Sequence, residues 1–367
     1  MSLNTEMVLD QQLLPIIEKV KNGQRLSLED GLTLYASTDL LTIGQMANYV
    51  NMKRNGNHVY FIENLYINPT NICEARCKWC GFRRDPEEDG AYAMDEEELL
   101  AYVEKRFNPR IREFHIVGGH NHTVPFEYYV NTVRTLKKHY PQVTIKAYTA
   151  AEIVFFAKIS GLTEEEVLKE LMKAGLDSLP GGGAEILTEE YRKKMSPDKA
   201  TTDEWLHVHR LAHELGMKTH ATMLYGSIES LQDRLTHMIR LRELQDETNG
   251  YLCFIPLAVQ PKKATASLKM RTSAFDDMKT LAISRLMLDN FPHVKAYWIN
   301  IGTQLTQMAI TFGSSDIHGT LVEERISHAA GALTQSGITR DELIYLIKGA
   351  NKQPIERDTF YNIVEEY

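Results

Sequence analysis

Cysteine is scarce in this sequence: the 367 residues include four, and three of these stand within eight positions of one another. Proteins held together by disulfides distribute paired cysteines along the chain, so this arrangement argues against a disulfide framework. It also favours a compartment in which thiols stay reduced. We therefore expect the protein in the cytoplasm.

Long apolar runs, a secretion signal and an excess of basic residues are also missing. No stretch of about 18 apolar residues occurs, and residues 1–20 lack the basic start and apolar centre of a signal peptide. Lysine and arginine number 41 against 49 acidic residues, for a net charge of -8, whereas nucleic-acid-binding domains are usually basic. We expect a small-molecule substrate, with neither a membrane nor a nucleic acid as partner.

What is present is a regular alternation of two kinds of segment. Stretches rich in β-branched and aromatic residues alternate with stretches of helical period, a pattern typical of parallel βα units. The sequence therefore predicts an α/β fold, a TIM-like (β/α) barrel of six to eight parallel strands. The expected strands are residues 58–67, 112–117, 143–148, 176–179, 217–223, 251–257, 294–301 and 309–313.

Amphipathic segments supply the expected helices, at 95–107, 126–139, 163–173, 202–215, 230–245 and 274–290. Three helix starts have the spacing of a capping box: Thr163 with Glu166, Thr201 with Glu204, and Thr339 with Glu342. Helices are also expected before the first strand and after the last. We predict a helical extension at 1–55, a barrel core at 56–319, and a C-terminal helical segment at 320–367 that packs on the barrel.

The clustered cysteines, Cys73, Cys77 and Cys80, form a C-x3-C-x2-C motif directly after the first expected strand. In a barrel, the loops that follow strands carry the chemistry. Three thiolates on a short loop can hold three irons of a [4Fe–4S] cluster, and the fourth iron then stays open to a chelating amine and carboxylate. The methionine end of S-adenosylmethionine (SAM) has both groups. An electron from the reduced cluster can then break the sulfonium bond to the 5′ carbon.

A structural zinc site is the alternative interpretation of this motif. Zinc requires a closed set of four ligands, which a histidine could complete here. The remaining cysteine, Cys253, stands inside an apolar strand and is predicted to be a core residue. An electron-transfer module is disfavoured, because such proteins generally close the cluster with a fourth cysteine, and none stands nearby in the sequence.

The spacing C-x3-C-x-aromatic-C, with Trp79 at the aromatic position, resembles the signature of the radical SAM superfamily. The resemblance implies that the three cysteines bind the cluster and that the backbone near Phe82 lies beside the adenine of SAM. It also implies an electron donor, such as flavodoxin or ferredoxin.

Two glycine-rich segments follow later strands. Gly118-Gly119 resembles the motif whose backbone accepts the SAM amino group, and a tight turn is the alternative. In the segment PGGGAE, Glu185 is expected to accept a hydrogen bond from the ribose or amino group of SAM. Arg192, two helical turns further on, is expected to pair with the SAM carboxylate. Solvated side chains are the alternative for both residues.

Several later residues are candidates for the substrate pocket. Tyr225 ends the fifth expected strand and could form a pocket wall, with core packing as the alternative. Asp316 follows the last expected strand and could face the substrate or cap its own loop. His115, His120 and His122 cluster near the glycine pair, so one of them could reach the pocket as an acid or base.

Longer segments resemble the menaquinone (futalosine) branch of the radical SAM superfamily. They are INPTNIC at 67–73, HIVGG at 115–119, PFEYY at 125–129, PGGGAEI at 180–186, ATMLYG at 221–226, FIPLA at 254–258 and QPIERDTFYN at 353–362. Of these, HIVGG and FIPLA resemble the aminofutalosine synthases. The resemblance implies addition of the 5′-deoxyadenosyl radical to 3-[(1-carboxyvinyl)oxy]benzoate, an enolpyruvyl benzoate, to give 6-amino-6-deoxyfutalosine. Dehypoxanthine futalosine cyclase and deazaflavin synthase-like enzymes are the alternatives.

The chain departs from those synthases where they often have histidines. Asn121, Ser227 and Gln260 stand at three such positions. These departures do not affect the implied binding of the cluster and SAM. They do mean that this chain lacks the histidines that the family would place at the substrate. Our hypothesis is that His122, shifted by one position, replaces the first of them.

Overall fold

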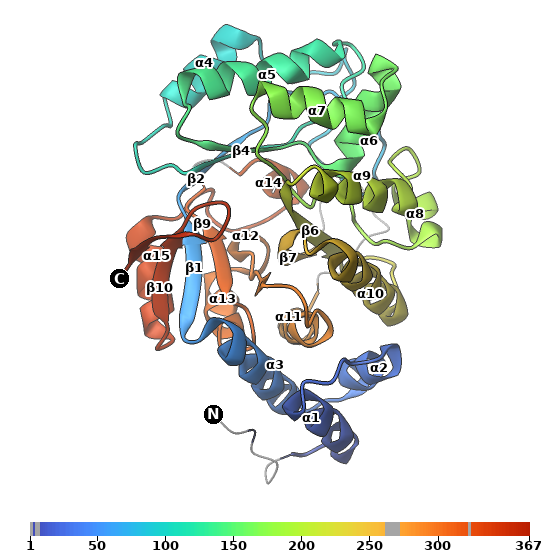
Figure 1. The fold of residues 1–367 in the computed structure, drawn as a ribbon, viewed down its shortest axis with the longest axis vertical. Coiled ribbons are helices and arrows are strands. Elements are labelled where there is room, and N and C mark those ends of the chain that lie inside the picture. The colour runs from blue at the N-terminus through green and yellow to red at the C-terminus, as the bar shows by residue number, and fades with distance from the viewer. Residues whose placement is uncertain (1–2, 4–7, 261–271, 322–323) are drawn as a thin grey trace.

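The structure is a computed structural model that describes residue 3 and residues 8–260, 272–321 and 324–367. Two sheets form its framework, one of seven strands and one of four, and helices surround both (Figure 1). Within the described ranges, no helix is long and apolar enough to cross a membrane.

The larger sheet consists of seven parallel strands in sequence order, from β2 to β8. Each strand is added beside its predecessor, as a series of βα units requires, and the sheet curls into half of a barrel. The predicted α/β fold with six to eight parallel strands is thus confirmed. The strands are β2 (Asn64–Ile67), β3 (Glu113–Ile116), β4 (Thr144–Ala147), β5 (Ser178–Leu179), β6 (Lys218–Tyr225), β7 (Tyr251–Ala258) and β8 (His293–Val294).

Helices follow the strands and pack against the sheet from outside, as Figure 1 shows for α5, α9 and α10. All six amphipathic segments form helices, and the capping boxes at Thr163 and Thr201 are both present. Helix α8 contains Arg192, which was expected on a helix after Glu185, whereas α6 was not anticipated. The helices are α4 (Glu96–Glu104), α5 (Phe126–His139), α6 (Ala150–Ser160), α7 (Glu164–Ala174), α8 (Glu189–Met195), α9 (Thr202–Glu214), α10 (Leu231–Thr248) and α11 (Ala274–Met287).

The smaller sheet has the order β11-β10-β1-β9 and joins sequence ends that lie far apart. The single strand expected at 58–67 was wrong, because Glu63 separates β1 in this sheet from β2 in the larger one. Strand β1 pairs with β10, where Ile355 is fully buried. The added elements are β1 (His58–Ile62), β9 (Asp316–Gly319), β10 (Gln353–Arg357) and β11 (Ile363–Glu366).

The C-terminal segment at 320–367 was expected to be helical, and it is only partly so. It contains α14 (Ile326–Ala330) and α15 (Arg340–Gly349), and the predicted capping box at Thr339 begins α15. Its end forms β10 and β11 instead, because the edge of β1 offers backbone hydrogen bonds to a polar segment that has no strand pattern of its own. The region boundaries at 55 and 319 stay predictions.

Two strands expected late in the barrel were also wrong. Strand β8 ends at Val294, and the rest of the segment 294–301 leads into α12 (Trp298–Ile301). Residues 309–313 lie at the end of α13 (Thr303–Ala309) and in the turn beyond it. Trp298 favours a strand locally, but it is fully buried and its indole N–H donates to the Gly319 oxygen over 3.0 Å. Tertiary packing here overrides local β propensity.

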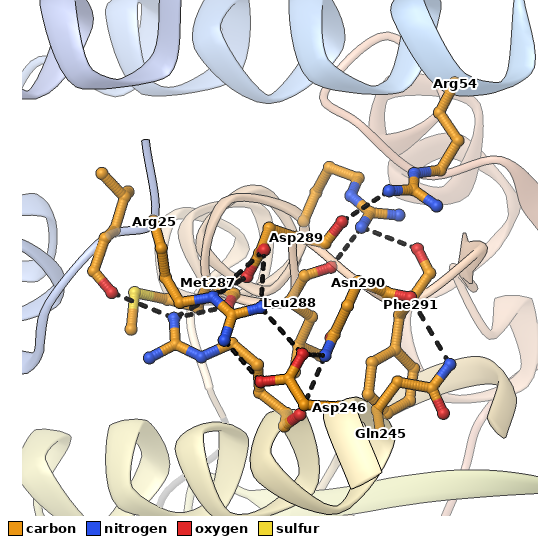
Figure 2. Close-up of polar contacts among 12 residues, drawn as sticks. Arg25, Arg54, Gln245, Asp246, Met287, Leu288, Asp289, Asn290 and Phe291 are labelled. Atoms are coloured by element: carbon orange, nitrogen blue, oxygen red, sulfur yellow. Dashed lines mark hydrogen bonds and ion pairs between the residues drawn. The ribbon is translucent and has the colours of Figure 1, made fainter. Parts of the chain in front are cut away.

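The helices expected at 8–50 are present and pack against α10 and α11. Figure 2 shows the guanidinium of Arg25 between the carboxylates of Asp246 and Asp289, with ion-pair distances of 2.5 and 2.9 Å. Arg54 donates to the Asp289 carbonyl oxygen over 2.5 Å, so the same loop anchors two N-terminal elements. The N-terminal region as a whole contains η1 (Gln11–Leu13), α1 (Leu14–Lys21), α2 (Leu28–Ala36) and α3 (Leu40–Asn55).

A buried ion pair crosses the smaller sheet. Arg357 on β10 donates from Nε to Asp316 Oδ2 over 2.7 Å, and neither side chain is exposed. Asp316 also accepts from the Tyr361 hydroxyl over 2.9 Å and from the His318 backbone N–H over 2.6 Å. Since β9 and β10 flank β1 on opposite sides, the pair ties the C-terminal segment to the centre of this sheet.

We predict that Arg357→Met lowers the free energy of unfolding by about 3–5 kcal/mol, because it leaves the Asp316 carboxylate buried without its principal cation. Arg134→Met is the matched control: Arg134 pairs with Glu127 at the surface, where both side chains are about half exposed, and the expected loss is below about 1 kcal/mol. Urea unfolding measures both variants. Equal midpoints for the two would show that the buried pair does not stabilise the fold.

Candidate active site

A cavity of about 300 Å³ lies inside the half-barrel, toward the carboxyl ends of its strands. Catalytic sites of parallel barrels lie at this edge. The cysteine loop after β2, the glycine pair after β3 and the segment 180–183 after β5 all contribute to its lining. Helix α14 and residues of β6 and β7 complete the wall.

The three clustered cysteines all line this cavity, and all are free thiols. The loop is held locally, since the Cys80 backbone N–H donates to the Cys77 oxygen over 3.1 Å. Cys73 Sγ accepts a hydrogen bond from the His120 backbone N–H over 3.2 Å. Burial raises the pKa of the Cys77 thiol to about 12, so a cationic partner would be needed to stabilise the thiolate.

The arrangement of the thiols fits an iron–sulfur cluster better than a single zinc ion. No group of three or more His, Cys, Asp or Glu side chains in the described part of the chain could hold one metal ion. A cluster of several irons spans a wider space and needs only the three thiols that share the cavity. Cys253 is fully buried in β7, as expected for a core residue.

Close packing against Gly119 determines where the cysteine loop lies. A Cβ at Gly119 would stand 2.0 Å from the Ile72 oxygen and 3.0 Å from the Cys73 Cβ. Gly118 donates its backbone N–H to Glu152 Oε1 over 3.1 Å, and both glycines line the cavity. Burial raises the pKa of Glu152 to about 7. The glycine pair thus serves as a tight contact for the cysteine loop, in addition to any contact with a ligand.

Glu185 lines the cavity as expected, whereas Arg192 does not. Glu185 has a left-handed backbone, with φ of 50°, and its Oε1 accepts from Lys199 Nζ over 2.8 Å. Backbone strain of this kind in a non-glycine residue is concentrated at functional sites. Arg192 is buried behind the loop and donates to the Ala184 oxygen over 2.5 Å and, through Nε, to the Ala200 oxygen over 2.9 Å. Its guanidinium therefore supports the loop, and the residue does not line the cavity.

Of the aromatic candidates, Phe82 and Trp79 line the cavity and Tyr225 does not. The Trp79 ring stacks on Tyr191 at a centroid distance of 6.2 Å. Tyr225 is fully buried, and its hydroxyl donates to Asp277 Oδ1 over 2.7 Å. The alternative of core packing therefore describes Tyr225.

Asp316 and His122 also lie outside the cavity lining. Asp316 is held by Arg357 in the smaller sheet, and His122 is an exposed residue. The structure therefore does not favour the hypothesis that His122 replaces a histidine at the substrate.

His115 and His120 do line the cavity, stacked on Tyr66 and Phe155 at centroid distances of 4.2 and 4.9 Å. Among the departures, Gln260 lines the cavity too, while its neighbour Pro261 falls outside the described residues.

Sequence reasoning identified only His115 in a polar set that we call the cavity floor. Its members come from the strands or the residue just after them, and all line the cavity: Tyr66, His115, Lys146, His220, Lys295 and His318. The lysines were detectable, because each interrupts an apolar segment that was itself expected to be a strand. A lysine is almost never fully buried unless it is paired, so a lysine inside such a segment points to a function.

Two family models match the sequence: the radical SAM superfamily over residues 67–241 and the CofH/MqnC C-terminal region over residues 248–366. The aminodeoxyfutalosine synthase of Thermus thermophilus is 47% identical over 97% of each chain. That of Streptomyces coelicolor is 42% identical over 95% of this chain and 93% of its own. The cyclic dehypoxanthine futalosine synthase of Halalkalibacterium halodurans is 34% identical over 96% of this chain and 95% of its own.

Among solved structures, methylornithine synthase has a TM-score of 0.72 at 16% identity, covering 92% of this chain and 96% of that one, which shows the shared fold. A parallel half-barrel with three free thiols at its carboxyl edge defines an α/β enzyme built around an iron–sulfur centre. With the relatives above, this shows that the chain belongs to the radical SAM superfamily, whose model matches residues 67–241, and the match to the Thermus thermophilus synthase extends over 97% of the chain. Its cofactors are accordingly a [4Fe–4S] cluster and SAM.

We predict that Gly119→Ala displaces the cysteine loop, because the added Cβ meets main-chain atoms that cannot rotate away. After anaerobic reconstitution, the variant is expected to hold roughly half of the wild-type iron or less. Gly118→Ala is the matched control, since its Cβ would stand 3.1 Å from the Thr70 oxygen and requires a smaller shift. Iron analysis with circular dichroism tests this; full iron content in Gly119→Ala would contradict it.

Proposed function

We propose that this protein is an aminodeoxyfutalosine synthase, which adds the 5′-deoxyadenosyl group of SAM to 3-[(1-carboxyvinyl)oxy]benzoate and forms 6-amino-6-deoxyfutalosine for menaquinone synthesis. The observation that carries the proposal is the 47% identity to the synthase of Thermus thermophilus over 97% of both chains. The cavity, which is lined by the three thiols and by the lysines of the cavity floor, supports it.

In this proposal the cysteine end of the cavity binds the cofactors. Cys73, Cys77 and Cys80 would hold three irons of the cluster. Gly118 and Gly119 would approach SAM through their backbone, Glu185 would accept from its ribose or amino group, and Phe82 would lie beside its adenine. The cluster and SAM together supply a reactive 5′ carbon when both are bound and an electron arrives.

The task of the chain is then positional. The alkene must be held against that carbon, and hydrogen donors and water must be kept away. Ile255 and Leu257 on β7 and Leu224 on β6 give the middle of the cavity an apolar wall suited to an aromatic ring. The electron donor would be a small redox protein such as a flavodoxin or ferredoxin, and the free thiols suit the reducing cytoplasm.

Dehypoxanthine futalosine cyclase is the second candidate, supported by the 34% identity to the Halalkalibacterium halodurans enzyme. The two activities differ in what becomes of SAM. The synthase incorporates the adenosyl group into its product, whereas a cyclase would use it to remove a hydrogen atom and would release 5′-deoxyadenosine.

We predict that anaerobic incubation with SAM, dithionite and the enolpyruvyl benzoate yields an adenosyl adduct with the mass of 6-amino-6-deoxyfutalosine. Mass spectrometry of the quenched reaction measures it, and omission of the benzoate is the control. Turnover of dehypoxanthine futalosine with release of 5′-deoxyadenosine, and no adduct from the benzoate, would favour the cyclase instead.

We also predict that Cys77→Ala abolishes both the iron chromophore and adduct formation, because a cluster cannot be held by two thiolates at this loop. Cys253→Ala removes a thiol that is fully buried in β7, away from the cavity lining, and is expected to keep wild-type iron content. Visible absorption and iron analysis after reconstitution compare them. Iron loss in both variants alike would show that the effect is not specific to the loop.

A further inference from the structure

The cavity floor contains two buried lysines with unused hydrogen-bond donors. Lys146 Nζ lies 2.7 Å from Glu113 Oε1, and Lys295 Nζ lies 3.1 Å from His318 Nδ1 and 3.6 Å from Asp316 Oδ1. An ammonium group has three N–H donors, so each lysine can donate further bonds into the cavity that it lines.

His220 lies in the same floor without a protein partner. Its ring is 1% exposed, yet neither ring nitrogen has a hydrogen-bond partner within the described residues. Buried polar groups in native proteins are almost always paired, because an unpaired one is costly. Burial, assisted by the positive charge of Lys146, holds the pKa of His220 well below its usual value, so the ring is neutral and has one N–H to donate.

The floor also has more positive charge than its carboxylates balance. Glu113 pairs with Lys146. Asp316 lies closer to the guanidinium of Arg357 than to the ammonium of Lys295, so Lys295 has no carboxylate of its own. Of the other carboxyl groups that line the cavity, Glu185 pairs with Lys199 and Glu324 with His328, and Glu152 accepts from the backbone N–H groups of Gly118 and Thr149 beside the glycine pair. An isolated buried cation is unfavourable, so the floor is suited to an anionic ligand.

We propose that Lys146, Lys295 and His220 bind the ring carboxylate of the substrate and thereby orient its alkene toward the cysteine end. This inference rests on the proposed function. In 3-[(1-carboxyvinyl)oxy]benzoate the alkene carries one carboxylate, and the second is on the aromatic ring, meta to the ether oxygen. With the alkene at the SAM end, the ring carboxylate reaches the floor, where its lone pairs can accept from all three donors.

Equilibrium binding to the reconstituted holoenzyme with SAM and without reductant tests the proposal. The two probes are 3-[(1-carboxyvinyl)oxy]benzoate and 2-phenoxyacrylate, which lacks the ring carboxylate. The wild-type protein is expected to bind the dicarboxylate at least about tenfold more tightly, as the loss of charge-assisted hydrogen bonds implies. Lys295→Met is expected to bind the dicarboxylate about tenfold more weakly and 2-phenoxyacrylate unchanged, so the preference disappears.

Two further variants guard against an indirect effect. Lys146→Met combined with Glu113→Gln removes the second lysine without leaving a buried carboxylate unpaired, and it is expected to reduce the preference as Lys295→Met does. Lys137→Met is the matched control, because that lysine pairs with Asp177 over 2.8 Å outside the cavity lining. It is expected to keep the wild-type preference.

The outcomes separate this inference from the proposed function. If the wild-type protein binds and converts the benzoate, but Lys295→Met keeps the full preference for it, the carboxylate assignment is overturned and the function stands. If Lys295→Met instead loses affinity for SAM, the floor serves SAM, and the assignment is likewise overturned. If the wild-type protein neither binds nor converts the benzoate, the proposed function fails and the inference falls with it.

Discussion

The in-register parallel pairing of β2 with β3, and of β3 with β4, positions both ends of the cavity at once. Because parallel strands end at the same edge, the cysteine loop after β2 meets the glycine pair after β3. The same register places Tyr66 beside His115 and His115 beside Lys146, one residue before the end of each strand. Side chains at equivalent positions of neighbouring parallel strands point to the same side of a sheet. One backbone constraint therefore creates a thiol-lined rim and, inside the half-barrel, a row of polar side chains.

The two matched regions of the chain build this cavity jointly. The first supplies the cysteines and Lys146, and the second supplies Lys295 and His318. Helix α14 packs closely against the cysteine loop. A Cβ at Gly81, in this loop, would stand 2.1 Å from the oxygen of Ala329, in α14. The C-terminal segment is in turn tied to the smaller sheet by β10. The position of the cysteine loop thus depends on C-terminal residues that are remote from it in sequence. The two matched regions can also enclose the apolar part of the cavity from both sides.

Local patterns in the sequence predicted what is local in the structure. The cysteine loop, the glycine pair and the capping boxes depend on residues within a few positions of one another, so spacing alone identifies them. Arg192 was placed in the pocket because it could share a helix face with Glu185, and Asp316 because it follows the last expected strand. Neither lines the cavity: Arg192 donates to the Ala200 oxygen, and Asp316 is held by Arg357, which is remote in sequence. Lys146 and Lys295 were visible as charges within apolar segments, yet the face that they occupy is set by strand pairing, which no local pattern reveals.

The energetic cost of burying the ammonium group of Lys295 indicates that the cavity floor binds a ligand. A methionine in place of Lys295 would fill similar space without the desolvation of an ammonium group, and it would leave no buried carboxylate without a cation. Asp316 would keep its pairing with Arg357. The fold therefore does not need the charge at this position, and the free protein bears a buried cation that it could do without. An anion that binds there would remove the imbalance and stabilise the folded state, by an amount that grows with the logarithm of its concentration once this exceeds Kd. The floor is better explained by its ligand than by the stability of the empty protein.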